Sequence, residues 1–191
     1  ALTILNKDSS IVIKNVCLND TRTGFYQILK KQGAKIKYKN IKKNIKLNLG
    51  NSGTLARLLI GILSTTSGIK AKLNGDHSLN KRSMKSLIEL MSKFGAYFLP
   101  KNKFNFPLKL VSTEMPIGIS YKAGVSAQLK SAVMFAGLNS YGNTTIIETQ
   151  KSRNHTENML LNNSEAIKIS NKRKKTITIF GKKHLNPFII D

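Results

Sequence analysis

The sequence predicts an α/β domain built from repeated βαβ-type units, and three observations support this fold class. Three stretches, 1–34, 56–96 and 130–166, each read as a helical segment, a short strand and a second helix. The spacing of 62 residues between Gly33 and Gly95, where two of these helices end, is too long for a solenoid repeat but suits a βαβ module. A chain of 191 residues can also bury one sizeable core.

The individual elements follow from local patterns. Glycine suits the left-handed conformation that ends many helices, so Gly33 and Gly95 mark two helix ends. The region 161–164 has no such glycine, which weakens the stop of the helix predicted to end near 164–166. Alternating or β-branched runs predict strands at 10–14, 35–38, 69–73, 108–110, 144–148 and 176–180.

A glycine-rich turn at 49–59 runs directly into an apolar helix. Gly50 and Gly53 allow a tight backbone, and Arg57 falls in the second helical turn. The side chains that can cap this helix are those of Asn51, Ser52 and Thr54. Free N–H groups and the positive end of the helix dipole favour an anion at this turn, although such turns more often cap a helix without any ligand.

Three further turns combine hydroxyl groups with cations at a predicted helix start. In 124–138 the residues Ser126, Gln128 and Lys130 come first, and a lysine there opposes the helix dipole unless an anion binds. In 151–159 we expect Ser152 to cap the helix, with Arg153 beside it. In 75–84 we expect Lys81 and Arg82 near the first turn. A single cation of this kind is usually a solvated surface charge, but four such turns together indicate several anionic groups bound in one cleft.

The four turns resemble the motifs of one enzyme family. G-N-S-G-T-L-A-R-L-L, G-D-H-S-L-N-K-R-S-M, S-A-Q-L-K-S-A-V-M-F-A-G-L and S-R-N-H-T-E-N-M-L are similar, in the same order, to the motifs of 5-enolpyruvylshikimate-3-phosphate (EPSP) synthase. The resemblance covers roughly residues 46–191. The chain departs from the family pattern at Ser83, where proline is usual, and at Asn154, where aspartate is usual.

The resemblance implies an inside-out α/β domain of three repeated βαβαββ-like units, with helices inside and sheets outside. We expect one domain over 1–191 with units at about 1–45, 46–110 and 111–191, the first being incomplete. The family's Lys-Ser-x-Ser-x-Arg loop would lie just before residue 1, and the run 19–24 resembles an N-P-T-R-T-G motif of the family's other domain. We therefore expect a partial or rearranged chain that is inactive without a second domain of the same enzyme.

The resemblance also implies substrates and roles for single residues. The expected reaction transfers the enolpyruvyl group of phosphoenolpyruvate to shikimate 3-phosphate in the shikimate pathway, without a cofactor or a metal. Shikimate 3-phosphate would bind Ser126, Ala127, Gln128 and Arg153. Phosphoenolpyruvate would bind Arg82, with Asn51, Gly53 and Thr54 shaping its side of the site. We expect Glu157 to be a helix-start partner of Arg153, and no residue can be assigned as the catalytic acid or base.

Two alternatives to this function remain, one suggested by the composition and one by a related enzyme. A formal charge of +23 suits a nucleic-acid-binding module, although the lysines are spread from Lys7 to Lys183 and no zinc spacing or aromatic RNA-binding motif accompanies them. The second alternative is the related UDP-N-acetylglucosamine enolpyruvyl transferase, against which the S-A-Q-x-K-S-A and R-N-H-T-E runs argue. A single cysteine, Cys17, no apolar run of membrane length and no secretory signal predict a cytoplasmic location without membrane contact.

Overall fold

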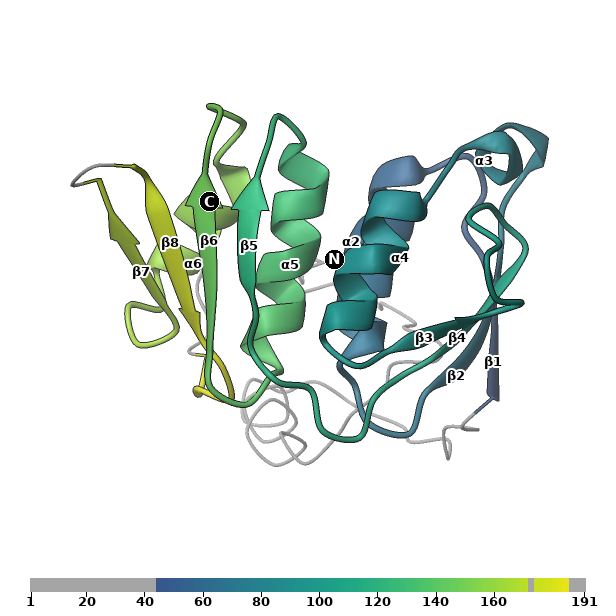
Figure 1. The fold of residues 1–191 in the computed structure, drawn as a ribbon, viewed down its shortest axis with the longest axis horizontal. Helices are drawn as coiled ribbons and strands as arrows, with labels where there is room; N and C mark the ends of the chain where they lie inside the picture. Colours follow the sequence, from purple (N-terminus) through teal and green to yellow (C-terminus); the bar gives the residue numbers. More distant parts are fainter. Residues whose placement is uncertain (1–43, 172–173, 186–191) are drawn as a thin grey trace, which may run out of the picture. The chain divides into compact units, whose positions relative to one another are not determined.

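The computed structural model describes residues 44–171 and 174–185, which contain two four-stranded sheets with helices between them (Figure 1). The first sheet has the order β1-β2-β4-β3 and the second the order β5-β6-β8-β7. In each sheet the first two strands pair in parallel and the other neighbours pair antiparallel. The strands are β1 (Asn44–Asn48), β2 (Lys70–Asn74), β3 (Tyr97–Leu99), β4 (Leu108–Val111), β5 (Ser120–Ala123), β6 (Asn143–Glu148), β7 (Ile167–Ser170) and β8 (Thr176–Phe180).

Helices fill the space between the two sheets. They are α2 (Gly53–Ser64), α3 (His77–Lys81), α4 (Lys85–Lys93), α5 (Ala127–Leu138) and α6 (His155–Leu161). Figure 1 shows α2, α4 and α5 lying between the two sheets, so that the sheets form the outer layers. The predicted inside-out α/β fold is therefore confirmed. None of the helices in 44–171 and 174–185 is long and apolar enough to span a membrane.

Alternation along the strands explains why each sheet can be an outer layer. In β2 the side chains of Ala71 and Leu73 are fully buried, while the alternating Lys70 and Lys72 are exposed. In β8, Ile177 and Ile179 are buried in the same alternating way. One face of each sheet thus packs on the helices while the other carries polar groups to solvent, as a period of two requires.

Helices α2 and α5 make the closest contact of the interior. A Cβ placed on Gly61 of α2 would lie 2.6 Å from the carbonyl oxygen of Ala132 in α5, so only glycine fits at this crossing. Helix α5 is buried on most sides, with Val133, Met134 and Ala136 completely covered. Small residues at the contact let the two backbones approach, and larger apolar ones fill the remaining space.

The two sheets repeat one arrangement of strands over the described residues. The second and third units have the same strand order and the same pairing directions, and Gly95 takes the predicted left-handed conformation with φ of 102°. The strands predicted at 10–14 and 35–38, the helix predicted to end at Gly33, the run 19–24 and Cys17 lie outside the described residues. The assignment of 1–191 to one domain of three units stays a prediction.

Three helix boundaries differ from the prediction. The turn at 75–84 opens a five-residue helix, α3, which is capped by Asp76, so Lys81 and Arg82 lie at its end and not in a first turn. Ser152 caps no helix, because α6 begins only at His155, after Asn154. Helix α6 also stops at Leu161, earlier than predicted, and Asn162 follows in a right-handed conformation in place of a glycine stop.

Candidate functional site

Two helix N-termini meet at one edge of the described unit. The Ser52 hydroxyl accepts a hydrogen bond from the Leu55 N–H at 3.1 Å, and the Ser126 hydroxyl accepts one from the Leu129 N–H at 3.3 Å. These caps fix the starts of α2 and α5 as the sequence predicts. The Gln128 side-chain amide donates to the Thr54 hydroxyl at 2.7 Å, which joins the first turns of the two helices directly.

A cleft of about 1020 Å³ opens beside the start of α5. Its walls come from the segment that follows β5 and from the segment that follows β6, and these two parallel strands end at the same edge of their sheet. Four of the predicted substrate-binding residues line the cleft: Ser126, Ala127, Gln128 and Arg153. The other lining residues are Val125, Glu148, Thr149, Gln150, Lys151, Ser152, Asn154 and Lys175.

The other four predicted residues gather at the start of α2. The Arg82 guanidinium donates to the Asn51 side-chain oxygen at 3.0 Å and to the Ser78 hydroxyl at 3.3 Å. Gly53 leaves room for this guanidinium, because a Cβ there would lie 3.3 Å from Arg82 Nη1. Thr54 connects the cluster to the first site through Gln128.

Arg57 belongs to the same cluster, although the predicted site residues omit it. Its Nη1 donates to the Gly53 carbonyl at 3.1 Å and would lie 2.9 Å from a Cβ on Gly53. Burial and then the positive charge of Arg82 lower the pKa of Arg57 below its usual value. No carboxylate among the described residues forms an ion pair with Arg57 or Arg82. Two adjacent guanidinium groups without a counter-ion, at a helix N-terminus, form a site suited to an anion.

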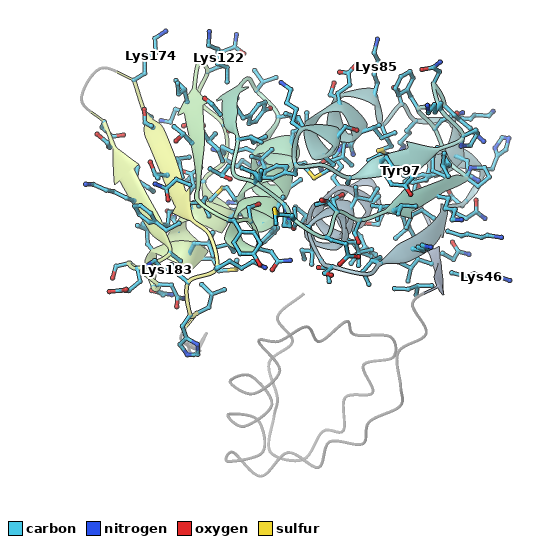
Figure 2. All side chains as sticks on the ribbon, turned by 60° about the horizontal axis from the view of Figure 1, so that its bottom comes forward. Lys46, Lys85, Tyr97, Lys122, Lys174 and Lys183 are labelled. Atoms are coloured by element: carbon cyan, nitrogen blue, oxygen red, sulfur yellow. The ribbon has the colours of Figure 1, made fainter. Side chains whose placement is uncertain are left out.

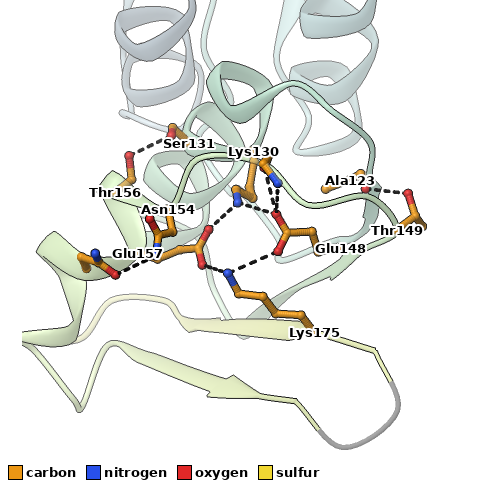
Figure 3. Close-up of polar contacts among 11 residues, drawn as sticks. Ala123, Lys130, Ser131, Glu148, Thr149, Asn154, Thr156, Glu157 and Lys175 are labelled. Atoms are coloured by element: carbon orange, nitrogen blue, oxygen red, sulfur yellow. Dashed lines mark hydrogen bonds and ion pairs between the residues drawn. The ribbon is translucent and has the colours of Figure 1, made fainter.

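A ring of four charged side chains lies beside the cleft, and two of them, Glu148 and Lys175, line it (Figure 3). The Lys130 ammonium contacts Glu148 at 2.7 Å and also contacts Glu157. The Lys175 ammonium contacts Glu148 at 3.2 Å and again Glu157. The side chains of Lys130 and Glu157 are each 1% exposed, whereas that of Lys175 is 29% exposed. Two lysines and two glutamates balance, so the ring adds no net charge to the cleft.

The ring keeps the Glu148 carboxylate ionised. Burial alone would raise the pKa of Glu148, but hydrogen bonds from Lys130, Ser152 and Lys175 outweigh burial and lower this pKa to about 2. Burial alone would lower the pKa of Lys175, but its hydrogen bonds with Glu157 and Glu148 outweigh burial and raise it. Glu148 therefore cannot hold a proton near neutral pH, and it is unsuited to general acid catalysis.

These contacts correct two predictions about the site. Glu157 pairs with Lys130 and Lys175, so its predicted partnership with Arg153 is wrong. Ser152 donates its hydroxyl to Glu148 at 2.9 Å and so orders the loop in place of capping α6. A lysine near the start of α5 indicates that a negative charge lies close to it. The spacing of residues in the sequence does not identify Glu148 and Glu157 as the source of that charge.

Comparison with known proteins agrees with this geometry. The profile of the family described as EPSP synthase (3-phosphoshikimate 1-carboxyvinyltransferase) matches residues 37–190. The chain belongs to the EPSP synthase family. The cleft beside α5 and the arginine cluster at the start of α2 both lie within the residues that match the EPSP synthase family.

Individual relatives in the EPSP synthase family match the same part of the chain. The 3-phosphoshikimate 1-carboxyvinyltransferase of Paramagnetospirillum magneticum is 41% identical over 138 residues, which are 71% of this chain and 31% of the relative. That of Rhodospirillum rubrum is 42% identical over 142 residues, 73% of this chain and 31% of the relative. The EPSP synthase structure from Acinetobacter baumannii has a TM-score of 0.64 at 33% identity and covers 73% of this chain and 31% of that protein. The chain thus spans about a third of the length of these relatives.

Proposed function

We propose that this chain forms part of an EPSP synthase, binding shikimate 3-phosphate and phosphoenolpyruvate for enolpyruvyl transfer in the shikimate pathway. The observation that carries the proposal is the junction of two anion-binding clusters at one edge. Gln128, which lines the cleft, holds Thr54 of the neighbouring cluster at 2.7 Å. Two anionic substrates that must react with each other need adjacent cationic subsites of this kind.

In this proposal each substrate has its own cluster. Shikimate 3-phosphate binds in the cleft, against Ser126, Ala127 and Gln128 at the start of α5 and against Arg153 on the opposite loop. Phosphoenolpyruvate binds at the start of α2, where Arg82 and Arg57 supply guanidinium groups. Asn51 orients Arg82, and Gly53 and Thr54 shape the floor of this subsite.

The reaction requires groups beyond those described. The 5-hydroxyl of shikimate 3-phosphate bonds to C2 of phosphoenolpyruvate and loses its proton, while C3 gains a proton. The tetrahedral intermediate then loses phosphate and a C3 proton to give the enolpyruvyl product. Glu148 is the one carboxylate among the described residues that line the cleft, and its low pKa makes it a poor proton donor. We therefore propose that a second domain of the same enzyme supplies the acid–base groups, and that the enzyme acts in the cytoplasm.

The distribution of positive charge supports a small-molecule site over an RNA-binding surface. Figure 2 shows the labelled lysines Lys46, Lys85 and Lys183 far apart, with Lys122 and Lys174 at one further edge, and all five are exposed. A nucleic-acid site would gather such charges along one face. A salt titration of RNA affinity beside the substrate titration separates the two functions, because a small anion in a structured cleft depends less steeply on salt than a polyanion does.

The test of the proposed function is a pair of titrations on the full chain, with calorimetry as the measurement. We expect saturable binding of shikimate 3-phosphate that Arg153→Lys weakens by about tenfold, because lysine keeps the charge but loses the two-pronged donor geometry. Arg82→Lys should weaken phosphoenolpyruvate binding by a similar factor and leave shikimate 3-phosphate binding nearly intact. The matched control is Lys85→Arg on the exposed face of α4. No saturable binding of shikimate 3-phosphate by a folded sample at millimolar ligand would refute the proposal.

A further inference from the structure

The buried ring described above connects four separate elements. Lys130 comes from α5, Glu148 from the end of β6, Glu157 from α6, and Lys175 from the residue before β8. Figure 3 shows each lysine lying between the two carboxylates. Each glutamate gives one oxygen to each lysine, so the removal of any member leaves an unbalanced charge in a place with little water.

The same ring holds the loop that carries Arg153. Besides its contact with Lys130, Glu148 Oε1 accepts hydrogen bonds from the Ser152 N–H at 3.1 Å and from the Ser152 hydroxyl at 2.9 Å. At the start of the loop the Thr149 N–H and hydroxyl both donate to the Ala123 carbonyl, at 2.9 and 2.8 Å. Arg153 itself is exposed and forms no ion pair within the described residues, so its position depends on its neighbours in the loop.

A contact beyond the loop links it to the other wall of the cleft. The Thr156 hydroxyl in α6 lies 2.7 Å from the Ser131 hydroxyl in α5, one residue after Lys130. Helix α5 therefore supplies both the substrate-facing residues at its start and, one turn later, the residues that hold the opposite loop. The cleft width between Ser126 and Arg153 is set by these buried contacts.

Stability alone does not account for such a ring. Buried ion pairs lose hydration, and apolar residues of similar size often replace them without loss of stability. Their better supported use is to specify one geometry among several. Here the ring lies directly behind a loop whose cation must face a helix N-terminus.

We infer that the ring Lys130–Glu148–Lys175–Glu157 positions the 149–154 loop so that Arg153 faces the start of α5 across the cleft. Lys130 and Glu157 are positioning residues that act through Glu148 and Ser152. This inference rests on the proposed function only for the identity of the ligand, because the order of the loop can be measured without any ligand.

The test follows two NMR signals of the full 191-residue chain, the Ser152 amide and the Arg153 Nε–Hε group, in 15N-labelled protein. Glu157→Gln and Lys130→Met each leave one unbalanced charge in the ring. Both should shift the two signals and raise the dissociation constant of shikimate 3-phosphate by at least about tenfold. The double variant Lys130→Met/Glu157→Gln removes one charge of each sign and keeps the Lys175–Glu148 contact, so the signals should return toward those of the parent chain. Its dissociation constant should then lie within about threefold of the parent value.

The control is Glu89→Gln, which makes the same chemical change in the exposed Lys85–Glu89 pair, 4.0 Å apart, and should move neither signal. Single variants that lower the melting temperature but leave the Ser152 and Arg153 signals and the binding unchanged would show that the ring is only structural. Should the single variants not fold, Lys175→Met takes their place, because its 29% exposed side chain leaves the remaining charges accessible to water. Unchanged Ser152 and Arg153 signals in that variant overturn the inference.

The two proposals fail in different ways. A parent chain that does not bind shikimate 3-phosphate, with Ser152 and Arg153 signals that still shift in the single variants, refutes the proposed function and supports the positioning role. A parent chain that binds, with signals and affinity that the single variants leave unchanged, supports the function and refutes the positioning role.

Discussion

Gly53 lets two guanidinium groups lie close to the start of α2. Arg57 and Arg82 approach it from α2 and from the end of α3, and either would contact a Cβ at this position. The resemblance to family motifs grouped Gly53, Asn51, Thr54 and Arg82, and the structure brings these residues together. It did not predict Arg57 as a site residue, since an arginine in the second turn of a helix has many possible orientations.

Gly53→Ala should therefore change binding more than stability. Gly53 has no positive φ and lies in the first turn of α2, where alanine is favourable, so the melting temperature should not fall. The flexible ends of Arg57 and Arg82 must move by a few tenths of an ångström, and we expect phosphoenolpyruvate affinity to fall about three- to tenfold. Calorimetry with both substrates measures this, and shikimate 3-phosphate binding should stay unchanged. Equal weakening of both ligands would contradict the assignment of separate subsites.

At the scale of elements, the strands β2, β4, β6 and β8 and the starts of α2 and α5 were predicted, whereas the strands β1, β3, β5 and β7 and the buried contacts were not. The strand predicted at 176–180 matches β8, and Ser52 and Ser126 cap α2 and α5 as expected, because period-two alternation and hydroxyl caps are local signals. The pairing of Lys130 with residues 148 and 157 depends on how α5, β6 and α6 pack, which no local pattern records. The short α3 also departed from expectation, because Asp76 caps a helix that ends after five residues.

The crossing of α2 and α5 gives a stability prediction. Gly61→Ala should destabilise the chain by about 1–3 kcal/mol, because the new Cβ would meet backbone atoms of Ala132 that cannot move aside. This loss should exceed the gain of about 1 kcal/mol that alanine gives in a helix. Gly124→Ala is the matched control, since a Cβ there has no heavy atom within 4 Å and should change the free energy of unfolding little. Equal unfolding free energies for both variants in urea would show that the two helices can separate at no cost.

At the scale of the whole molecule, the described residues offer more groups for holding anions than for transferring protons. They hold two cation-rich clusters and one cleft, yet the carboxylate in that cleft has a pKa of about 2 and two lysine partners. The chain also spans about 31% of the length of its relatives. The family and the fold could be predicted from four motifs, whereas the proposed sharing of the site between two domains cannot be predicted from any motif among the described residues.

We expect the purified chain to bind substrate but to show no measurable turnover, because proton transfer needs a positioned acid of suitable pKa. A phosphate-release assay with both substrates measures this directly. Addition of the complementary domain of a relative should restore some rate if the two surfaces fit. Clear turnover by the chain alone, abolished by Arg153→Ala, would contradict the proposed division of the site.

The Thr54–Gln128 hydrogen bond also links ligand occupancy to unfolding. Thr54 belongs to the repeat with the first sheet and Gln128 to the repeat with the second, so we expect a ligand bound at either cluster to stabilise both repeats through this hydrogen bond. A ligand that binds only the folded state adds RT ln(1 + [L]/Kd) to the unfolding free energy, about 2.7 kcal/mol at one hundred times Kd. We therefore expect the two sheets to unfold in a single transition when substrate is bound, because this hydrogen bond connects the ligand-bearing helix start of one repeat to that of the other.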